Sequence, residues 1–278
     1  MIDKFKKLTL KALMSDEKLM YGLVLKGGNA LQLVYEITDR ASMDIDFSIE
    51  GDFSELDIQR IDSILDVLLN EQFQTENFVV FDVKINEKPK NSVVEIWKGY
   101  CIEFKITDSD KYFPTDMDKT RRLAHKILDQ STKFTVDISS FEYVTTKRKV
   151  EIDGTVLYVY TPDMIVLEKL RALCQSIPEY KDIIPTARIK GRARDYYDIW
   201  NICQHYEINF NSDENLALIE DIFKAKWVPL EFLSLLDTNK DLQRENWTSV
   251  EDTLSVKSKG FDFYFENTMD IVKLIRNQ

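Results

Sequence analysis

Segments that alternate apolar and polar residues are concentrated in roughly the first 160 residues of this chain, and helical patterns dominate afterwards. The alternating segments predict β-strands. They are SMDIDFSI, FVVFDVKIN, SVVEIWKGYCIEFKIT, KFTVDIS, VEIDG and LYVYT. Because strands and helices segregate along the chain, we expect an α+β domain over residues 1–160 and a helical domain over residues 161–278, joined near Pro162.

Apolar residues recur at helical spacing through most of the remaining sequence. The predicted helices cover roughly residues 2–18, 29–37, 54–71, 117–129, 162–176, 191–206, 214–225 and 265–277. No apolar run approaches the about 20 residues that a transmembrane helix needs, and the N-terminal segment lacks the apolar core of a signal peptide. Three widely spaced cysteines in apolar surroundings favour buried thiols over disulfides. We therefore expect a cytoplasmic protein with no membrane partner.

The stretch LKGGNALQLVYEITDRASMDIDFSI places two glycines before a short helical pattern and two aspartates on the following strand. At a period of two residues, Ser42, Asp44 and Asp46 project from one strand face, with the two carboxylates about 7 Å apart along the chain. Such carboxylates repel unless a cation lies between them or one takes up a proton, which favours a divalent metal. Gly27 and Gly28 at the helix entrance let backbone N–H groups approach an anion, which predicts a phosphate site.

Either pattern alone is more often a simple turn or a solvated edge strand, but together they resemble the signature of polymerase-β-like nucleotidyltransferases. The fuller segment KGGNALQLVYEITDRASMDIDF is similar to the AbiEii/AbiGii-type toxin nucleotidyltransferases, in which Gly-Gly-x-Ala-Leu precedes Arg-x-Ser-x-Asp-hydrophobic-Asp-Phe. The resemblance continues at EKLRAL and RDYYDI, and only the last 70 or so residues carry no motif. It implies a polymerase-β-like core, with a mixed sheet flanked by helices, followed by a helical C-terminal domain.

The resemblance also implies a third carboxylate on a neighbouring strand. Asp137 in KFTVDIS is expected to project from the polar face of its strand, and Glu103 in YCIEFKI is the alternative candidate for the third carboxylate. Asp137 is preferred because the family places such a strand after a helix like the one predicted at residues 117–129. Asp44, Asp46 and Asp137 are thus the expected ligands of Mg²⁺ or Mn²⁺.

The helical half contributes a lysine and two aspartates. Lys169 borders the buried stripe of its helix, which by itself favours a lysine whose stem lies along apolar surface. Asp195 and Asp198 lie on a core-facing stripe, where carboxylates are costly unless paired or liganded, and Lys169 is a natural partner. The resemblance implies that Lys169 contacts triphosphate oxygens and that Asp195 completes the site. An alternative for Asp198 is to organise its helix by pairing with Arg194.

The formal net charge of −11 argues against general nucleic-acid binding. One basic run nevertheless lies beside Asp195, and a second is TTKRKV. Charge runs are usually solvated faces, but these are the best candidates for holding a polyanionic acceptor such as RNA. The residues of the first run are Arg188, Lys190, Arg192 and Arg194.

These features predict a metal-dependent nucleotidyltransferase that releases pyrophosphate from an NTP. The expected nucleotide-binding residues are Lys26, Gly27, Gly28, Asn29, Ser42 and Lys169. Asn29 stands where serine or threonine often follows the glycines, and its amide can still donate to phosphate. By resemblance the acceptor is a tRNA 3′ end, and the setting is a toxin with an antitoxin partner or a phage-defence pair. The alternatives are an enzyme that modifies a protein or small molecule, and a catalytically silent nucleotide-binding module.

Overall fold

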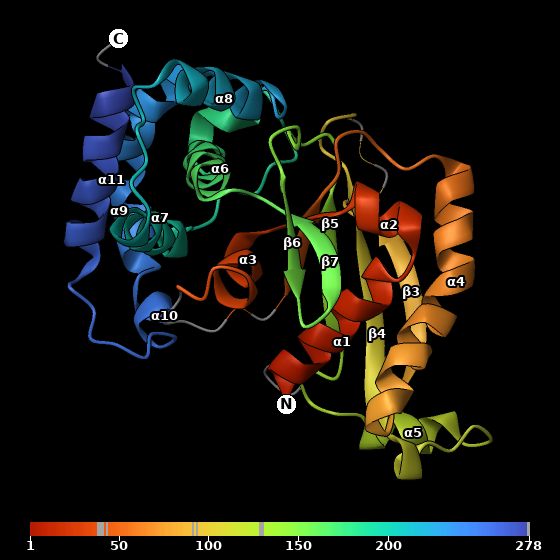
Figure 1. The fold of residues 1–278 in the computed structure, drawn as a ribbon. Coiled ribbons are helices and arrows are strands. Elements are labelled where there is room, and N and C mark those ends of the chain that lie inside the picture. Colours follow the sequence, from red (N-terminus) through yellow and green to blue (C-terminus); the bar gives the residue numbers. More distant parts are fainter. Residues whose placement is uncertain (38–41, 43, 91, 93, 128–130, 277–278) are drawn as a thin grey trace. The chain divides into compact units, whose positions relative to one another are not determined.

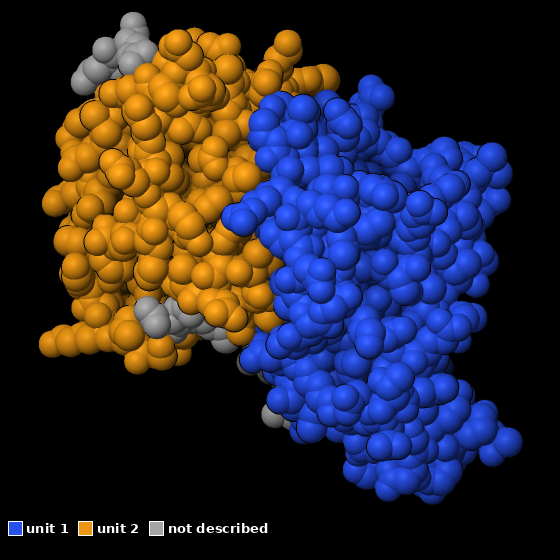
Figure 2. Space-filling model, in the orientation of Figure 1, with its two compact units in different colours: residues 1–29, 43–159 blue, residues 30–42, 160–278 orange. Residues whose placement is uncertain are grey.

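The computed structural model describes residues 1–37, 42, 44–90, 92, 94–127 and 131–276. The chain divides into two compact units, which Figure 2 colours separately. The first comprises residues 1–29 and 43–159, and the second comprises residues 30–42 and 160–278. The division after Val159 lies close to the join predicted near Pro162. The sequence carries no signal that residues 30–42 group with the C-terminal part.

The first unit contains a seven-stranded mixed sheet with the strand order β3-β4-β5-β2-β1-β7-β6 (Figure 1). Its strands are β1 (Val24–Lys26), β2 (Ile45–Ser48), β3 (Phe78–Glu87), β4 (Gly99–Asp108), β5 (Phe134–Ser139), β6 (Arg148–Ile152) and β7 (Thr155–Val159). The pairs β1–β7 and β2–β5 are parallel, and the other neighbours are antiparallel. One face is apolar because Leu25, Phe47 and Ile138 occupy the alternate, buried positions.

Four helices of the first unit are α1 (Ile2–Met14), α2 (Glu17–Gly22), α4 (Glu55–Phe73) and α5 (Met117–Leu123). Helix α4 packs against β3 and α1. It begins with a capping box, in which Ser54 and Asp57 each accept a hydrogen bond from the other's backbone N–H. A buried stripe at intervals of four residues then faces the sheet, formed by Ile61, Leu65, Leu69 and Phe73.

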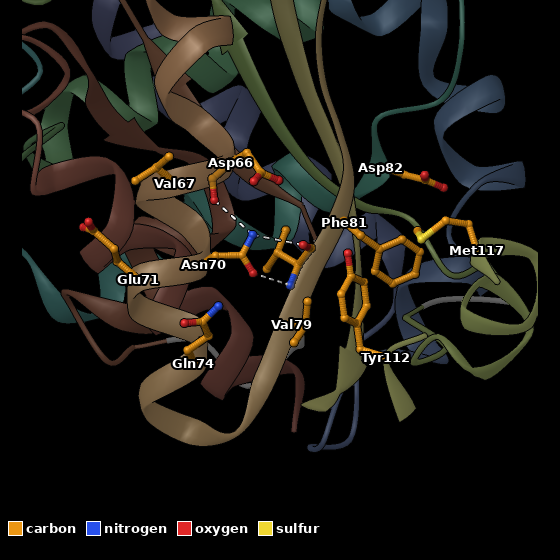
Figure 3. A pocket seen from close by; sticks show the side chains of 11 residues that line it. Asp66, Val67, Asn70, Glu71, Gln74, Val79, Phe81, Asp82, Tyr112 and Met117 are labelled. Atoms are coloured by element: carbon orange, nitrogen blue, oxygen red, sulfur yellow. Dashed lines mark hydrogen bonds between the residues drawn. The ribbon is translucent and has the colours of Figure 1, made fainter. Parts of the chain in front are cut away.

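Strand β3 is an edge of the sheet, and α4 protects part of it. The Asn70 amide nitrogen donates to the Val80 carbonyl at 3.0 Å, and the Val80 N–H donates to the Asn70 carbonyl oxygen at 2.9 Å (Figure 3). These bonds occupy backbone groups that an added strand would otherwise pair. Side chains of α4 and β3, together with Tyr112 and Met117, line an open pocket of about 540 Å³ at this edge.

The second unit is helical within its described residues. Its helices include α6 (Pro162–Cys174), α7 (Ala193–His205), α8 (Asp213–Lys224), α9 (Lys240–Glu245), α10 (Thr248–Glu251) and α11 (Phe261–Arg276). Helix α6 packs on α7 and α8, and α7 packs on α11. Thr161 accepts a hydrogen bond from the Met164 N–H and Pro162 opens α6, which confirms the predicted helix start.

The predicted α+β class, with a mixed sheet flanked by helices, is confirmed, and several boundaries differ. The helix predicted over residues 2–18 breaks at Asp16, whose side chain caps α2 by accepting from the Leu19 N–H. Strand β2 is shorter than SMDIDFSI, so Ser42 lies outside it and Asp44 immediately precedes it. Helix α3 (Gly27–Leu33) starts at the glycines and ends earlier than predicted.

The helix predicted over residues 117–129 is too long, because α5 ends at Leu123 and the next four residues are not helical. Helix α11 begins at Phe261 rather than at residue 265. Three residues of the predicted helices fall outside the described residues. These are residues 128–129 and residue 277, and Arg40 of the resembling motif is also outside. Among the described residues, no helix combines the length and the apolar character needed to cross a bilayer.

Candidate functional site

The sheet of the first unit places the predicted carboxylates on two adjacent strands. Asp46 of β2 and Asp137 of β5 are register partners in a parallel pair. Their side chains share the less buried face of the sheet, because Phe47 and Ile138 occupy the alternate, buried positions. Asp44 is exposed just before β2, and its carboxylate accepts a hydrogen bond from the Thr135 hydroxyl at 2.7 Å. Thr135 was not expected from the sequence, although it shares the phase of Asp137 in β5.

Glu103, the alternative third carboxylate, lies on a strand that is not adjacent to β2. It belongs to β4, where it is in register with Thr135 of β5. Its carboxylate forms an ion pair with Lys133 at 2.9 Å. The strand order therefore favours Asp137 over Glu103 as the neighbour of Asp46.

Gly27 forms the bend between β1 and α3 that the sequence predicts. Its φ of +66° lies in the left-handed region that favours glycine. A Cβ added there would lie 3.0 Å from Asp46 Oδ2, so the glycine also permits the close approach of this carboxylate. Asn29 is fully buried, and its side-chain amide donates to the backbone carbonyl of Asp44. This bond ties the start of α3 to the start of β2, whereas the sequence predicts a phosphate contact for Asn29.

Lys26 ends β1 directly beside Asp46, with which it is in register. Its ammonium lies 3.3 Å from Glu142 Oε1, and both side chains are less than a tenth exposed. Glu142 carries no sequence signal for this role, because it is 116 residues away in the chain and follows no motif.

A second unexpected residue, Lys88, binds Asp137. Its ammonium donates to both carboxylate oxygens of Asp137 at 2.9 Å. Burial alone would lower the pKa of Lys88, but the hydrogen bonds and charge of Asp137, with further contributions from Cys101 and Asp44, raise it. Lys88 and Asp137 are 49 residues apart, and the segment EKPKN has no periodicity that would have indicated the contact.

The donor chemistry of this face fits a divalent cation. Carboxylate oxygens are the hard ligands that Mg²⁺ and Mn²⁺ prefer. In this structure the Lys88 ammonium supplies the positive charge next to Asp137. Within the described part of the chain, no group of three or more His, Cys, Asp or Glu side chains stands in position to hold a metal ion. Asp44, Asp46 and Asp137 are thus the candidate metal donors because of their carboxylate oxygens and the register of β2 with β5. Their present arrangement is not that of a formed coordination site.

In the second unit, Lys169 of α6 lies between two aspartates of α7, as the sequence predicts. Its ammonium is 2.8 Å from Asp195 Oδ1 and 2.7 Å from Asp198 Oδ2, and its side chain is only 6% exposed. Arg192 donates to Asp195 Oδ2 at 2.6 Å. Burial opposes the ionisation of Asp195, but the charges of Arg192 and Lys169 outweigh it and hold the pKa well below its ordinary value.

The alternative in which Asp198 pairs with Arg194 is wrong, because Asp198 is buried against Lys169 whereas Arg194 is exposed. The four residues of the basic run also differ in their surroundings. Arg192 turns toward Asp195 and is only partly exposed. The exposed members of the run are Arg188, Lys190 and Arg194.

The seven-stranded mixed sheet flanked by helices, with carboxylates on two adjacent strands, has the fold of nucleotidyltransferase-like structures. The crystal structure of a candidate nucleotidyltransferase from H. pylori matches with a TM-score of 0.52 and 16% identity, over 99% of this chain and 93% of that chain. JHP933 from Helicobacter pylori matches with a TM-score of 0.52 and 16% identity, over 99% of this chain and 90% of that chain. These likenesses show the fold alone. No curated protein sequence matches the chain significantly.

The family membership comes from the sequence. The family described as nucleotidyl transferase AbiEii toxin, of type IV toxin–antitoxin systems, matches residues 9–267. The chain therefore belongs to the AbiEii family, and it is a nucleotidyltransferase.

Proposed function

We propose that this nucleotidyltransferase uses a divalent cation to transfer an NMP from an NTP to an RNA acceptor, the 3′ end of a tRNA. The observation that carries the proposal is the register pairing of Asp46 with Asp137, with Asp44 beside them and Gly27 against Asp46. A toxin paired with an antitoxin is the proposed setting, which the type IV toxin–antitoxin family supports.

The carboxylates would bind the cation, and one of them would accept the proton of the acceptor hydroxyl. Asp44, Asp46 and Asp137 would bind Mg²⁺ or Mn²⁺, which when bound neutralises phosphate charge and polarises the reacting phosphoryl group. Asp137 would also draw the proton from the attacking hydroxyl. Thr135 would fix the Asp44 carboxylate through its 2.7 Å hydrogen bond.

The remaining proposed contacts are to the phosphates. The backbone N–H groups of Gly27 and Gly28 would donate to phosphate oxygens, helped by Lys26 and by the Ser42 hydroxyl. Lys169 would neutralise charge on the departing pyrophosphate. Because Asp195 and Asp198 already hold the Lys169 ammonium at 2.8 and 2.7 Å, a triphosphate has to compete with them for it.

The exposed basic side chains of Arg188, Lys190 and Arg194 are the proposed contacts for the RNA backbone. Contacts of this kind weaken as salt rises, because binding releases counterions from the phosphates. Replacing all three residues should therefore lower RNA affinity and flatten its salt dependence.

The test is to incubate the full chain with each labelled NTP, Mg²⁺ and total RNA, and to repeat the reaction without RNA. Label on RNA supports the proposal, and loss of that label in D44A, but not in D66A, assigns it to the site. Asp66 is an exposed aspartate of α4 and serves as the matched control. Label on protein would favour the modifying enzyme instead. Nucleotide binding without any transfer would favour the silent module, and either result contradicts the proposal.

A further inference from the structure

Lys88 has an anchored backbone and an exposed side chain that reaches the carboxylates. Its N–H donates to the Gly99 carbonyl at 2.8 Å, which anchors the residue immediately after β3. Its ammonium reaches both oxygens of Asp137, yet the side chain remains 60% exposed. Such an ion pair is weak and exchangeable, because water and salt screen exposed charges.

The surrounding charges explain why a lysine occupies this position. Asp137 lies beside Asp46 on the neighbouring strand, and Asp44 adds to the negative field that acts on Lys88. On the other side of Asp46 in the sheet, its register partner is Lys26, whose ammonium pairs with Glu142. Lys88 therefore supplies the positive charge on the Asp137 side of three carboxylates that would otherwise repel one another.

We propose that Lys88 is a built-in counter-ion that competes with the divalent cation for Asp137 and so weakens the binding of free metal. This inference rests on the proposed function, because it takes the three aspartates to be the metal ligands. A divalent ion binds carboxylate oxygens at about 2.1 Å, inside the position of an ammonium that donates to both oxygens. A divalent cation that took both oxygens of Asp137 would displace an ammonium that donates to the same two oxygens.

The test is a calorimetric titration of the nucleotide-free protein with Mn²⁺ at low ionic strength. K88M should bind Mn²⁺ about two- to fivefold more tightly than the wild type, which is the range expected for release of an exposed ion pair. The difference should narrow as salt is added. K88R keeps the charge and should stay close to the wild type. K90M removes an exposed lysine of the same loop and should also leave the affinity unchanged.

D44N distinguishes failure of this inference from failure of the proposed function. If K88M binds Mn²⁺ no more tightly than the wild type while D44N loses binding, the role of Lys88 is wrong and the metal site stands. If D44N binds Mn²⁺ as well as the wild type does, the carboxylate site itself is wrong, and the proposed function falls with it. A melting curve for each variant confirms that it is folded.

Discussion

Replacing Lys169 by methionine tests how far the second unit depends on one buried cation. Methionine keeps the length and most of the volume of the lysine stem but removes the bonds of 2.8 and 2.7 Å to Asp195 and Asp198. The lysine side chain is only 6% exposed, so water cannot take over these bonds without opening the helix packing. We expect K169M to lose about 3–5 kcal/mol of unfolding free energy, the usual result of removing one partner of a buried ion pair.

Urea denaturation followed by tryptophan fluorescence is a suitable assay, because three of the four tryptophans lie in the second unit. They are Trp200, Trp227 and Trp247. K88M is the matched comparison, since Lys88 also makes two hydrogen bonds to carboxylate but is 60% exposed, and it should lose less than about 1 kcal/mol. Circular dichroism should register that small loss in the first unit. Equal small losses in K169M and K88M would show that burial does not set the strength of these pairs.

Three further predictions follow from single contacts. N70A should lose about 1–3 kcal/mol of stability in urea denaturation, because the backbone groups of Val80 lose their partner, and N70D should restore only the bond from the Val80 N–H. G27A should lose about 1–2 kcal/mol and most transfer activity, because alanine is strained at a φ of +66°. G22A has no atom within 4 Å of its added Cβ and is the control. Since the folded pKa of Asp195 lies below the ordinary 3.8, its contribution is full above about pH 4 and is lost as pH falls through the folded pKa. Comparing the acid unfolding of D195N with that of the wild type checks this sign.

Local patterns were sufficient for the elements and for the phase of their side chains. Period-two alternation in KFTVDIS put Asp137 on the face away from Val136 and Ile138, and the register of β5 agrees. Spacing along α6 and α7 likewise indicated that Lys169 would meet the aspartates of α7. These predictions depend on neighbours within one element and on a general rule, that a buried carboxylate needs a partner.

Contacts between distant segments could not be predicted in the same way. Asn70 pairs with Val80 because α4 happens to present an amide at the open edge of β3, and an asparagine on a helix surface has no unique partner in sequence. Lys88 meets Asp137 only because β4 is placed between their strands and its Gly99 anchors the start of the loop. Strand order, which the sequence does not encode locally, decides such contacts.

Lys88 and Lys169 show why the same bond lengths have different consequences. Each ammonium makes two hydrogen bonds to carboxylate oxygen at 2.7–2.9 Å, but one side chain is 60% exposed and the other 6%. An exposed ammonium can leave its carboxylate for water at little cost, so a ligand of modest affinity can displace it. A buried ammonium leaves charges behind in a poorly solvated site, so it remains where it is unless the incoming anion replaces both of its partners. Lys88 is therefore suited to respond to an arriving cation, whereas Lys169 can serve a triphosphate only if Asp195 and Asp198 release it.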